Sequence, residues 1–227
     1  MCTYRLKPVI AAVLYVVIWL VCSQRFALAD EKSRSRPTDT SSACKLWTDA
    51  DHASWIATWS GPCVNGFASG HGVAQWSNNG VPADRYEGDF SEGAPHGEGV
   101  LTHSDGGGYS GEWKAGRKSG KGRMTNVIGD HYFGEFEDDE AGGVGIFQLA
   151  IGANYVGEFK DGRPNGLGVL SFPHGEKYAG EFAAGRPDGQ GIFVDAAGEK
   201  YIGMFKNGQP TEQPDSAPIL DTAIEVR

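Results

Sequence analysis

Aromatic residues and glycines return at a fixed interval through most of this chain. From Tyr86 to Tyr201 a tyrosine recurs every 23 residues, and each one opens a five-residue segment that ends in Phe or Trp. In the segment that begins at Tyr155, alternation places Tyr155, Gly157 and Phe159 on one face of an extended strand and the two remaining residues on the other. A fixed period of about 20 to 50 residues is typical of repeat architectures. The pattern therefore predicts a chain built from equivalent β units.

Each unit has the composition of a β-hairpin. A G-x-G pair follows 11 and 13 residues after Tyr155, at Gly166 and Gly168, and the segment from Gly162 to Gly166 has the composition of a turn. Glycines that face the same side as the rings leave flat backbone across which the rings can lie. Because one hairpin is marginal alone, we expect neighbours to stack and join their rings. The predicted fold is all-β, an elongated single-layer twisted ribbon of stacked 23-residue β-hairpins.

The predicted aromatic stripe has two interpretations. It is either the core of the ribbon, which we favour, or an exposed row that stacks sugars or receives an apolar ligand. The stripe consists of Tyr86, Phe90, Tyr109, Trp113, Tyr132, Phe136, Tyr155, Phe159, Tyr178, Phe182, Tyr201 and Phe205.

A row of carboxylates follows the same period. With two strands per unit, its members lie roughly 10 Å apart, too wide for the paired carboxylates of a glycosidase. We therefore expect a structural role in which each carboxylate accepts hydrogen bonds from the next hairpin. The row consists of Asp89, Glu112, Glu135, Glu158 and Glu181.

The motif YxGEFxxGxxxGxG at a 23-residue step resembles the MORN repeat. The resemblance covers about residues 59 to 208. It implies an elongated ribbon of β-hairpins, a scaffolding or attachment role, proposed membrane or phospholipid association, and no catalytic activity of its own. Two departures predict local irregularity: Asp139 stands where a turn glycine is expected, and Met204 replaces the acidic residue in the last unit.

The first 29 residues have the pattern of a secretory signal peptide. Arg5 and Lys7 precede a 14-residue apolar run at 9–22, and Ala27 and Ala29 form an A-x-A cleavage site. The run is short for a membrane span, which needs about 20 residues. We expect cleavage after Ala29 and export to the periplasm or the exterior; the alternative is an uncleaved N-terminal anchor.

The remaining chain divides by composition. Residues 30–43 are polar and predict a flexible linker, residues 44–85 an N-terminal cap with a degenerate repeat, residues 86–208 the repeat array, and residues 209–227 a C-terminal tail. The only two cysteines after the leader are Cys44 and Cys63. Two thiols in an oxidising compartment usually pair, so we predict a disulfide between them. Trp47, Trp55 and Trp76 lie outside the repeat register and either make a specific contact or pack within the cap.

The net charge and the motifs of the chain limit the classes of function that it can have. The whole chain has a net charge of −9, and removing the three positive charges of the leader leaves −12, which argues against nucleic acid and anionic lipid as electrostatic partners. No catalytic, metal-binding or cofactor-binding motif is recognised, so we predict a non-enzymatic protein without cofactors. The expected role is an interaction or scaffolding surface in the cell envelope, with a protein partner. Membrane lipid and envelope polysaccharide are the alternative partners, and the sequence assigns no oligomeric state.

Overall fold

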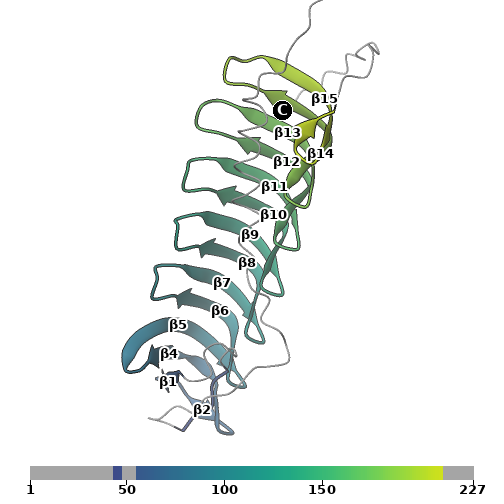
Figure 1. Cartoon of the computed structure of the whole chain (residues 1–227). Coiled ribbons are helices and arrows are strands. Elements are labelled where there is room, and N and C mark those ends of the chain that lie inside the picture. The colour runs from purple at the N-terminus through teal and green to yellow at the C-terminus, as the bar shows by residue number, and fades with distance from the viewer. Residues whose placement is uncertain (1–42, 48–54, 212–227) are drawn as a thin grey trace, which may run out of the picture.

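The computed structural model describes residues 43–47 and 55–211, and the described chain is built from antiparallel β-strands (Figure 1). β1 pairs with β4, and from β4 to β16 each strand pairs with the next in sequence, giving one 14-stranded sheet. β2 and β3 form a separate two-stranded sheet. The strands are β1 Ile56–Trp59, β2 Cys63–Val64, β3 Phe67–Ala68, β4 Gly70–Asn78, β5 Val81–Ser91, β6 Ala94–Thr102, β7 Gly108–Lys114, β8 Arg117–Thr125, β9 His131–Glu137, β10 Glu140–Gln148, β11 Asn154–Lys160, β12 Arg163–Ser171, β13 Lys177–Ala183, β14 Arg186–Val194, β15 Lys200–Lys206 and β16 Gln209–Pro210.

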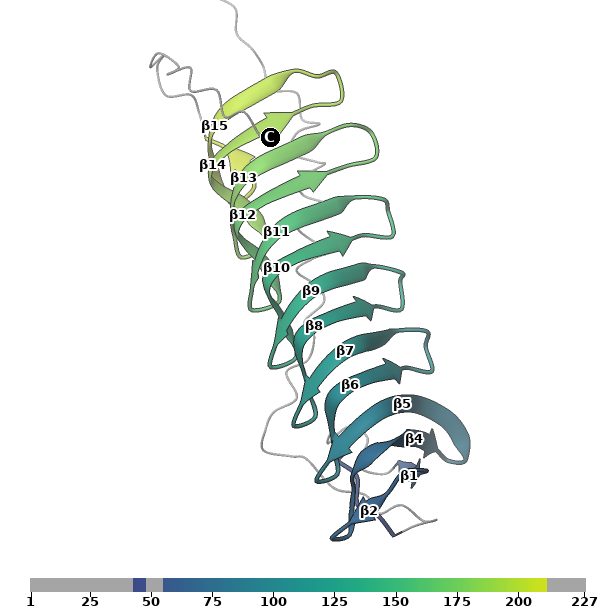
Figure 2. The same cartoon turned by 180° about the vertical axis from the view of Figure 1, so that it is seen from behind.

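The sheet is a long, open, single-layer ribbon, which confirms the predicted fold class. Its hairpins are bent and stack along the long axis, with wide loops along one edge and tight turns along the other (Figures 1 and 2). Burial alternates along the strands that carry the aromatic stripe; in β11, Tyr155 and Phe159 are buried whereas Val156 and Glu158 are exposed. The predicted assignment of faces is therefore correct.

The predicted position of the hairpin turn was wrong. The turn between β11 and β12 is formed by Asp161 and Gly162, whose φ angles are 51° and 70°. Two consecutive positive φ values match the right-handed twist of the flanking strands. Pro164 lies within β12, directly opposite Phe159, and the residues between Pro164 and Gly168 form a register shift opposite Glu158. The Pro-Asn-Gly segment thus makes a bulge in the strand, because the preceding two residues already reverse the chain.

A backbone hydrogen bond ties each tight turn to the repeat before it. The N–H of Gly185 donates to the carbonyl of Pro164 at 2.8 Å, and equivalent bonds of 2.8–3.1 Å recur along the ribbon. Their donor and acceptor pairs are Gly93 and Ala68, Gly116 and Pro95, Asp139 and Lys118, Gly162 and Ala141, and Gly208 and Pro187. These bonds lie outside the strand ladders and couple neighbouring units.

The irregularity predicted at Asp139 does not occur. Asp139 adopts a φ of 75°, and its N–H makes the same inter-repeat bond as the glycines do. Its carboxylate also accepts a hydrogen bond from the Lys118 N–H at 2.8 Å. Asp tolerates this conformation better than most residues, and the additional bond offsets the backbone strain.

The ribbon ends at a short strand. β16 pairs with β15 only through Phe205 with Pro210 and Lys206 with Gln209. The predicted signal peptide with Ala27 and Ala29, the linker up to residue 42, and residues 212–227 of the tail lie outside the described residues. Within the described ranges, no helix is long and apolar enough to cross a membrane.

Candidate functional site

The aromatic stripe forms one continuous chain of edge-to-face ring contacts. Tyr155 packs against Phe159 of its own strand and Phe182 of the next repeat, with ring centroids 5.1 and 4.9 Å apart. The same alternation runs from Tyr86 to Phe205, with centroid distances of 4.8–5.4 Å and interplanar angles of 79–90°. At its N-terminal end, Trp59 extends the chain through a 4.6 Å contact with Phe90. Edge-to-face pairs of this geometry contribute about 0.5–1.5 kcal/mol each beyond the burial of their area.

The rings are buried although the ribbon is only one layer thick. Apart from the half-buried Tyr201, the residues of the stripe are 0–7% exposed. Glycines make this possible: a Cβ added to Gly168 would lie 2.4–2.5 Å from the phenol of Tyr155. The predicted flat seat is therefore observed, and it recurs at Gly99, Gly122, Gly145 and Gly191 under the preceding repeat tyrosines. The bent hairpins enclose the stripe as a core.

The hydroxyl of each tyrosine in the stripe also donates a hydrogen bond that was not predicted from the sequence. The Tyr155 hydroxyl donates to the backbone carbonyl of Glu158 at 2.9 Å, and the other repeat tyrosines make the same i to i+3 bond at 2.9–3.3 Å. Burial, and next the nearby Glu181 carboxylate, raise the pKa of Tyr178 to about 12. The signal for this bond was present in the sequence, because the first ring position is always Tyr whereas the second varies between Phe and Trp.

The carboxylate row lies against the bulges on the exposed side of the sheet. Glu112 accepts the Lys121 N–H at 2.8 Å, and Glu158 accepts the Leu167 N–H at 3.1 Å. These donors belong to the partner strand of the same hairpin, so the expected bond from the next hairpin was assigned to the wrong strand. The glutamates pack on the first glycine of the G-x-G pair; a Cβ at Gly166 would lie 2.5 Å from the Glu158 carboxylate. Asp89 also lies against the first glycine of its G-x-G pair, Gly97, and its Oδ1 is 3.1 Å from His71 Nδ1.

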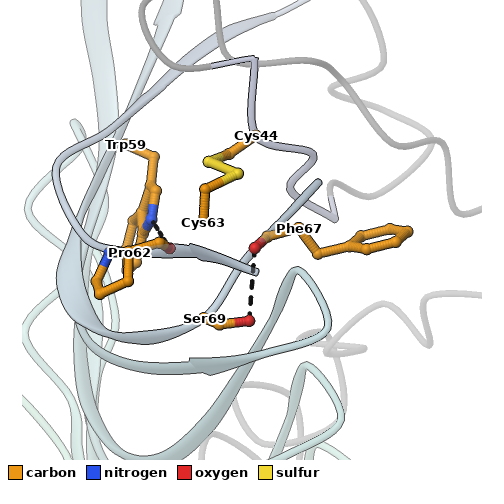
Figure 3. Close-up of a disulfide and its surroundings, with 6 residues drawn as sticks. All are labelled: Cys44, Trp59, Pro62, Cys63, Phe67 and Ser69. Carbon is orange, nitrogen blue, oxygen red and sulfur yellow. Dashed lines mark hydrogen bonds between the residues drawn. A yellow bond between two sulfur atoms is a disulfide. The ribbon is translucent and has the colours of Figure 1, made fainter. Parts of the chain in front are cut away.

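The N-terminal cap is closed by a disulfide between Cys44 and Cys63, with Cα atoms 5.8 Å apart (Figure 3). This bond holds the segment 43–47 beside β2 and β3, where the Lys45 N–H donates to the Gly66 carbonyl at 2.9 Å. Trp59 turns its indole N–H to the Pro62 carbonyl at 2.9 Å (Figure 3).

The three out-of-register tryptophans have structural contacts in the cap. Trp76 is buried in the core, and Trp55 packs against it. The Trp47 indole donates to the Glu92 carbonyl at 3.1 Å. Trp55 and Trp76 therefore pack within the cap, one of the two interpretations, whereas Trp47 joins the segment 43–47 to the turn after β5.

Among the described residues, no group of three or more His, Cys, Asp or Glu side chains is arranged to hold a metal ion. Within the described ranges, the shorter of two histidine–carboxylate contacts joins His103 Nδ1 and Asp84 Oδ2 at 2.6 Å. This hydrogen bond is the largest influence on His103 and raises its pKa, whereas burial acts in the opposite direction. The pair connects a wide loop to β5.

Comparison with protein families agrees with this geometry. The MORN repeat model matches the chain in seven segments, at 64–81, 86–108, 109–131, 132–153, 155–177, 178–200 and 201–211. The chain belongs to the MORN repeat family. The matches begin within the degenerate cap unit and extend through the two-residue strand β16. No curated protein matches the chain.

Membership of the MORN repeat family indicates a general class of function. MORN repeats are generally interaction or membrane-associating modules, and the family is generally non-catalytic. In this MORN protein the periodic tyrosines, aromatic partners and glycines form the core.

Proposed function

We propose that this MORN protein is a non-enzymatic interaction or scaffolding surface that acts in the cell envelope and binds a protein partner. One observation carries the proposal: the rings of the aromatic stripe pack against one another inside the ribbon, and apart from Tyr201 its residues are only 0–7% exposed. Sugars or apolar ligands need exposed ring faces for stacking. The outer face of the sheet and its wide loops are left as the contact surface.

The location in the envelope rests on two features. The leader has the pattern of an export signal, and the disulfide between Cys44 and Cys63 favours an oxidising compartment. N-terminal sequencing of the protein recovered from cells tests this part. A mature start at Asp30 is expected, and a retained leader would replace export with membrane anchoring.

The alternative partner is a lipid surface. The net charge of −9 for the whole chain opposes binding to anionic headgroups, because the electrostatic contribution to such binding comes from clustered Lys and Arg. The ribbon carries both signs: residues 114–123 contain five Lys and Arg and no Asp or Glu, whereas over the whole chain Glu and Asp are in excess. Protein is therefore the favoured partner.

The experiment is capture from envelope fractions with residues 30–227 as bait, followed by flotation of the same protein with vesicles of zwitterionic and of anionic lipid. We expect a protein to be retained in stoichiometric amount after detergent washing, and no flotation with either vesicle. Flotation without a retained protein would contradict the proposal and support the membrane alternative. Bait that has been reduced and heat-unfolded is the control for non-specific capture.

A further inference from the structure

An apolar row crosses seven successive strands on the face opposite the aromatic stripe. Strand register places each member directly opposite the next, from β9 to β15. We call this row the outer ladder; it consists of Phe133, Ile146, Val156, Val169, Ala179, Ile192 and Ile202. At its first strand the guanidinium of Arg123 lies over the Phe133 ring, 5.0 Å from the centroid.

The aliphatic side chains of the outer ladder are exposed. Ile146, Val156, Val169 and Ile192 are 40–48% exposed, and Ile202 is 66% exposed. Contiguous exposed apolar surface on a soluble protein is typical of an interaction site. A one-layer antiparallel sheet ordinarily places polar residues on its solvent face, so this row departs from the usual pattern.

The earlier repeats of the chain show that the fold does not require aliphatic residues in this row. Register continues the row through β5 to β8, where the residues are Glu87, Val100, Ser110 and Arg123. These earlier repeats have the same buried rings and the same hairpin geometry. Since three of these four residues are polar, packing alone does not explain why every position from β9 onward is apolar.

A second row flanks the outer ladder and combines charge with apolar surface. Two residues further along the strands, Val144 faces Glu158 and Leu167 faces Glu181 across neighbouring strands. Val144 is 60% and Leu167 is 62% exposed. Glu135 precedes them on β9, so β9, β11 and β13 each present one glutamate, and Met204 takes the same position on β15. The opposite flank is mixed, with Gln148, Asn154, Ser171, Lys177, Val194 and Lys200.

We propose that the outer ladder is the docking surface for an amphipathic helix of the partner protein, laid along the ribbon axis with an aliphatic stripe on the ladder and Lys or Arg facing the glutamate flank. The proposal rests on the proposed function and names its contact surface. The length of the surface suits a helix: seven strands at about 4.8 Å spacing span about 29 Å, the length of a helix of about 19 residues.

The periods of the two surfaces also correspond. Successive a and d positions of a heptad are on average about 5.2 Å apart along a helix, close to the strand spacing of about 4.8 Å. Glutamates two strands apart are separated by about 9.6 Å, and side chains seven residues apart on a helix by about 10.5 Å. A heptad with one basic residue at a fixed position therefore meets one glutamate per repeat from β9 to β13.

The negative charge of the glutamate flank favours a basic helix over the other candidate partners. A second copy packed ladder to ladder with the two ribbons antiparallel would bring its own row of glutamates to the same flank, which is unfavourable. A bilayer with anionic headgroups would meet the acidic flank. A basic amphipathic helix complements both the aliphatic row and the glutamates.

The test uses designed 21-residue helical peptides as probes. The first has Leu and Ile at a and d, Lys on one flank and Gln on the other; the second replaces the Lys residues with Glu; the third has the composition of the first with a scrambled stripe. Binding to the mature protein is measured by fluorescence anisotropy at low and at physiological salt. A triple variant, Val156→Thr, Val169→Thr and Ile192→Thr, removes apolar surface and keeps β-branched side chains in the strands. Val100→Thr, in the same row outside the ladder, is the matched control.

We expect the first peptide to bind, and its Kd to rise about tenfold or more in the triple variant and not in the control. The Glu peptide should bind at least tenfold more weakly than the Lys peptide, and salt should weaken the Lys peptide. Unchanged circular dichroism and melting of the triple variant show that the fold is retained. Equal binding of the scrambled peptide, equal binding by the triple variant, or no binding by the native protein would overturn the proposal.

Two further outcomes are separated by parallel measurements. Ladder-dependent flotation with vesicles, or ladder-dependent dimerisation in sedimentation velocity, would assign the surface to a bilayer or to a second copy and overturn the helix proposal. If the partner captured from envelope fractions is retained equally by the triple variant, the interaction function stands and the outer ladder is the wrong surface. Failure to capture any partner counts against the proposed function itself.

Discussion

The hydroxyl of Tyr155 donates a hydrogen bond to the backbone carbonyl of Glu158, three residues further along the same strand, at 2.9 Å. The bond pins the ring flat above Gly168, while Phe159 and Phe182 approach the ring edge to face. One repeat thus orients its tyrosine, and the next repeat packs on it. Coupling between neighbours of this kind is what makes a hairpin array cooperative.

Removing the hydroxyl alone should have a modest cost. We expect Tyr155→Phe to lower the free energy of unfolding by about 1 kcal/mol, because the ring contacts persist and one hydrogen bond to a part-buried carbonyl is lost. Urea unfolding of the two proteins measures the difference. A substitution without effect would mean that the carbonyl of Glu158 is equally well satisfied by solvent.

Substituting the glycine beneath the Tyr155 ring should also destabilise the protein. Gly168→Ala should destabilise by about 1–3 kcal/mol, because the new methyl would overlap the Tyr155 phenol. Gly162→Ala is the matched control, since its φ of 70° adds only backbone strain of about 1 kcal/mol and its added methyl meets nothing within 4 Å. A double-mutant cycle with Tyr155→Ala should abolish most of the Gly168→Ala penalty. Strict additivity of the two substitutions would show that the ring is not the obstacle.

Strand alternation and the 23-residue step predicted the sheet, its faces and the seat of the rings, because these depend on local spacing. The turn was misplaced because Pro164, Asn165 and Gly166 have the composition of a turn, whereas two consecutive positive φ angles at Asp161 and Gly162 decide the reversal. The carboxylate bond was given to the wrong strand because the bulge that presents the Leu167 N–H depends on register. The outer ladder also depends on strand register between neighbouring repeats, which the sequence of a single repeat does not reveal.

The disulfide should stabilise the cap. With a sequence separation of 19, the bond between Cys44 and Cys63 closes a loop whose restriction in the unfolded chain contributes about 3 kcal/mol. We expect the Cys44→Ser and Cys63→Ser double variant to unfold first at its N-terminal end, as measured by hydrogen exchange of the amides in β1 to β4. Two reactive thiols in the native mature protein, found by labelling without reductant, would contradict the pairing.

The contact between His103 and Asp84 should give the protein a pH dependence of defined sign. Since the pKa of His103 in the folded protein is raised above the ordinary value of 6.5, the contact contributes fully to stability below that value. Its contribution is lost as the pH rises through the higher folded pKa. NMR titration should show this raised pKa, and Asp84→Asn should lower it and flatten the melting temperature across the same pH window. Titration of His103 at or below 6.5 in the native protein would be inconsistent with the hydrogen bond at 2.6 Å.

The central claim, that the aromatic stripe is the core of the ribbon, is tested most directly by equilibrium unfolding of Tyr155→Ala beside Tyr201→Ala. Tyr155 is 2% exposed and has ring partners on both sides, whereas half-buried Tyr201 packs against Phe205 of its own strand at the end of the array. We predict that Tyr155→Ala lowers the free energy of unfolding by about 3 kcal/mol or more and that Tyr201→Ala lowers it by clearly less. A Tyr155→Ala protein that unfolds like the native one, yet fails to capture the partner, would contradict the account and make the stripe the binding face.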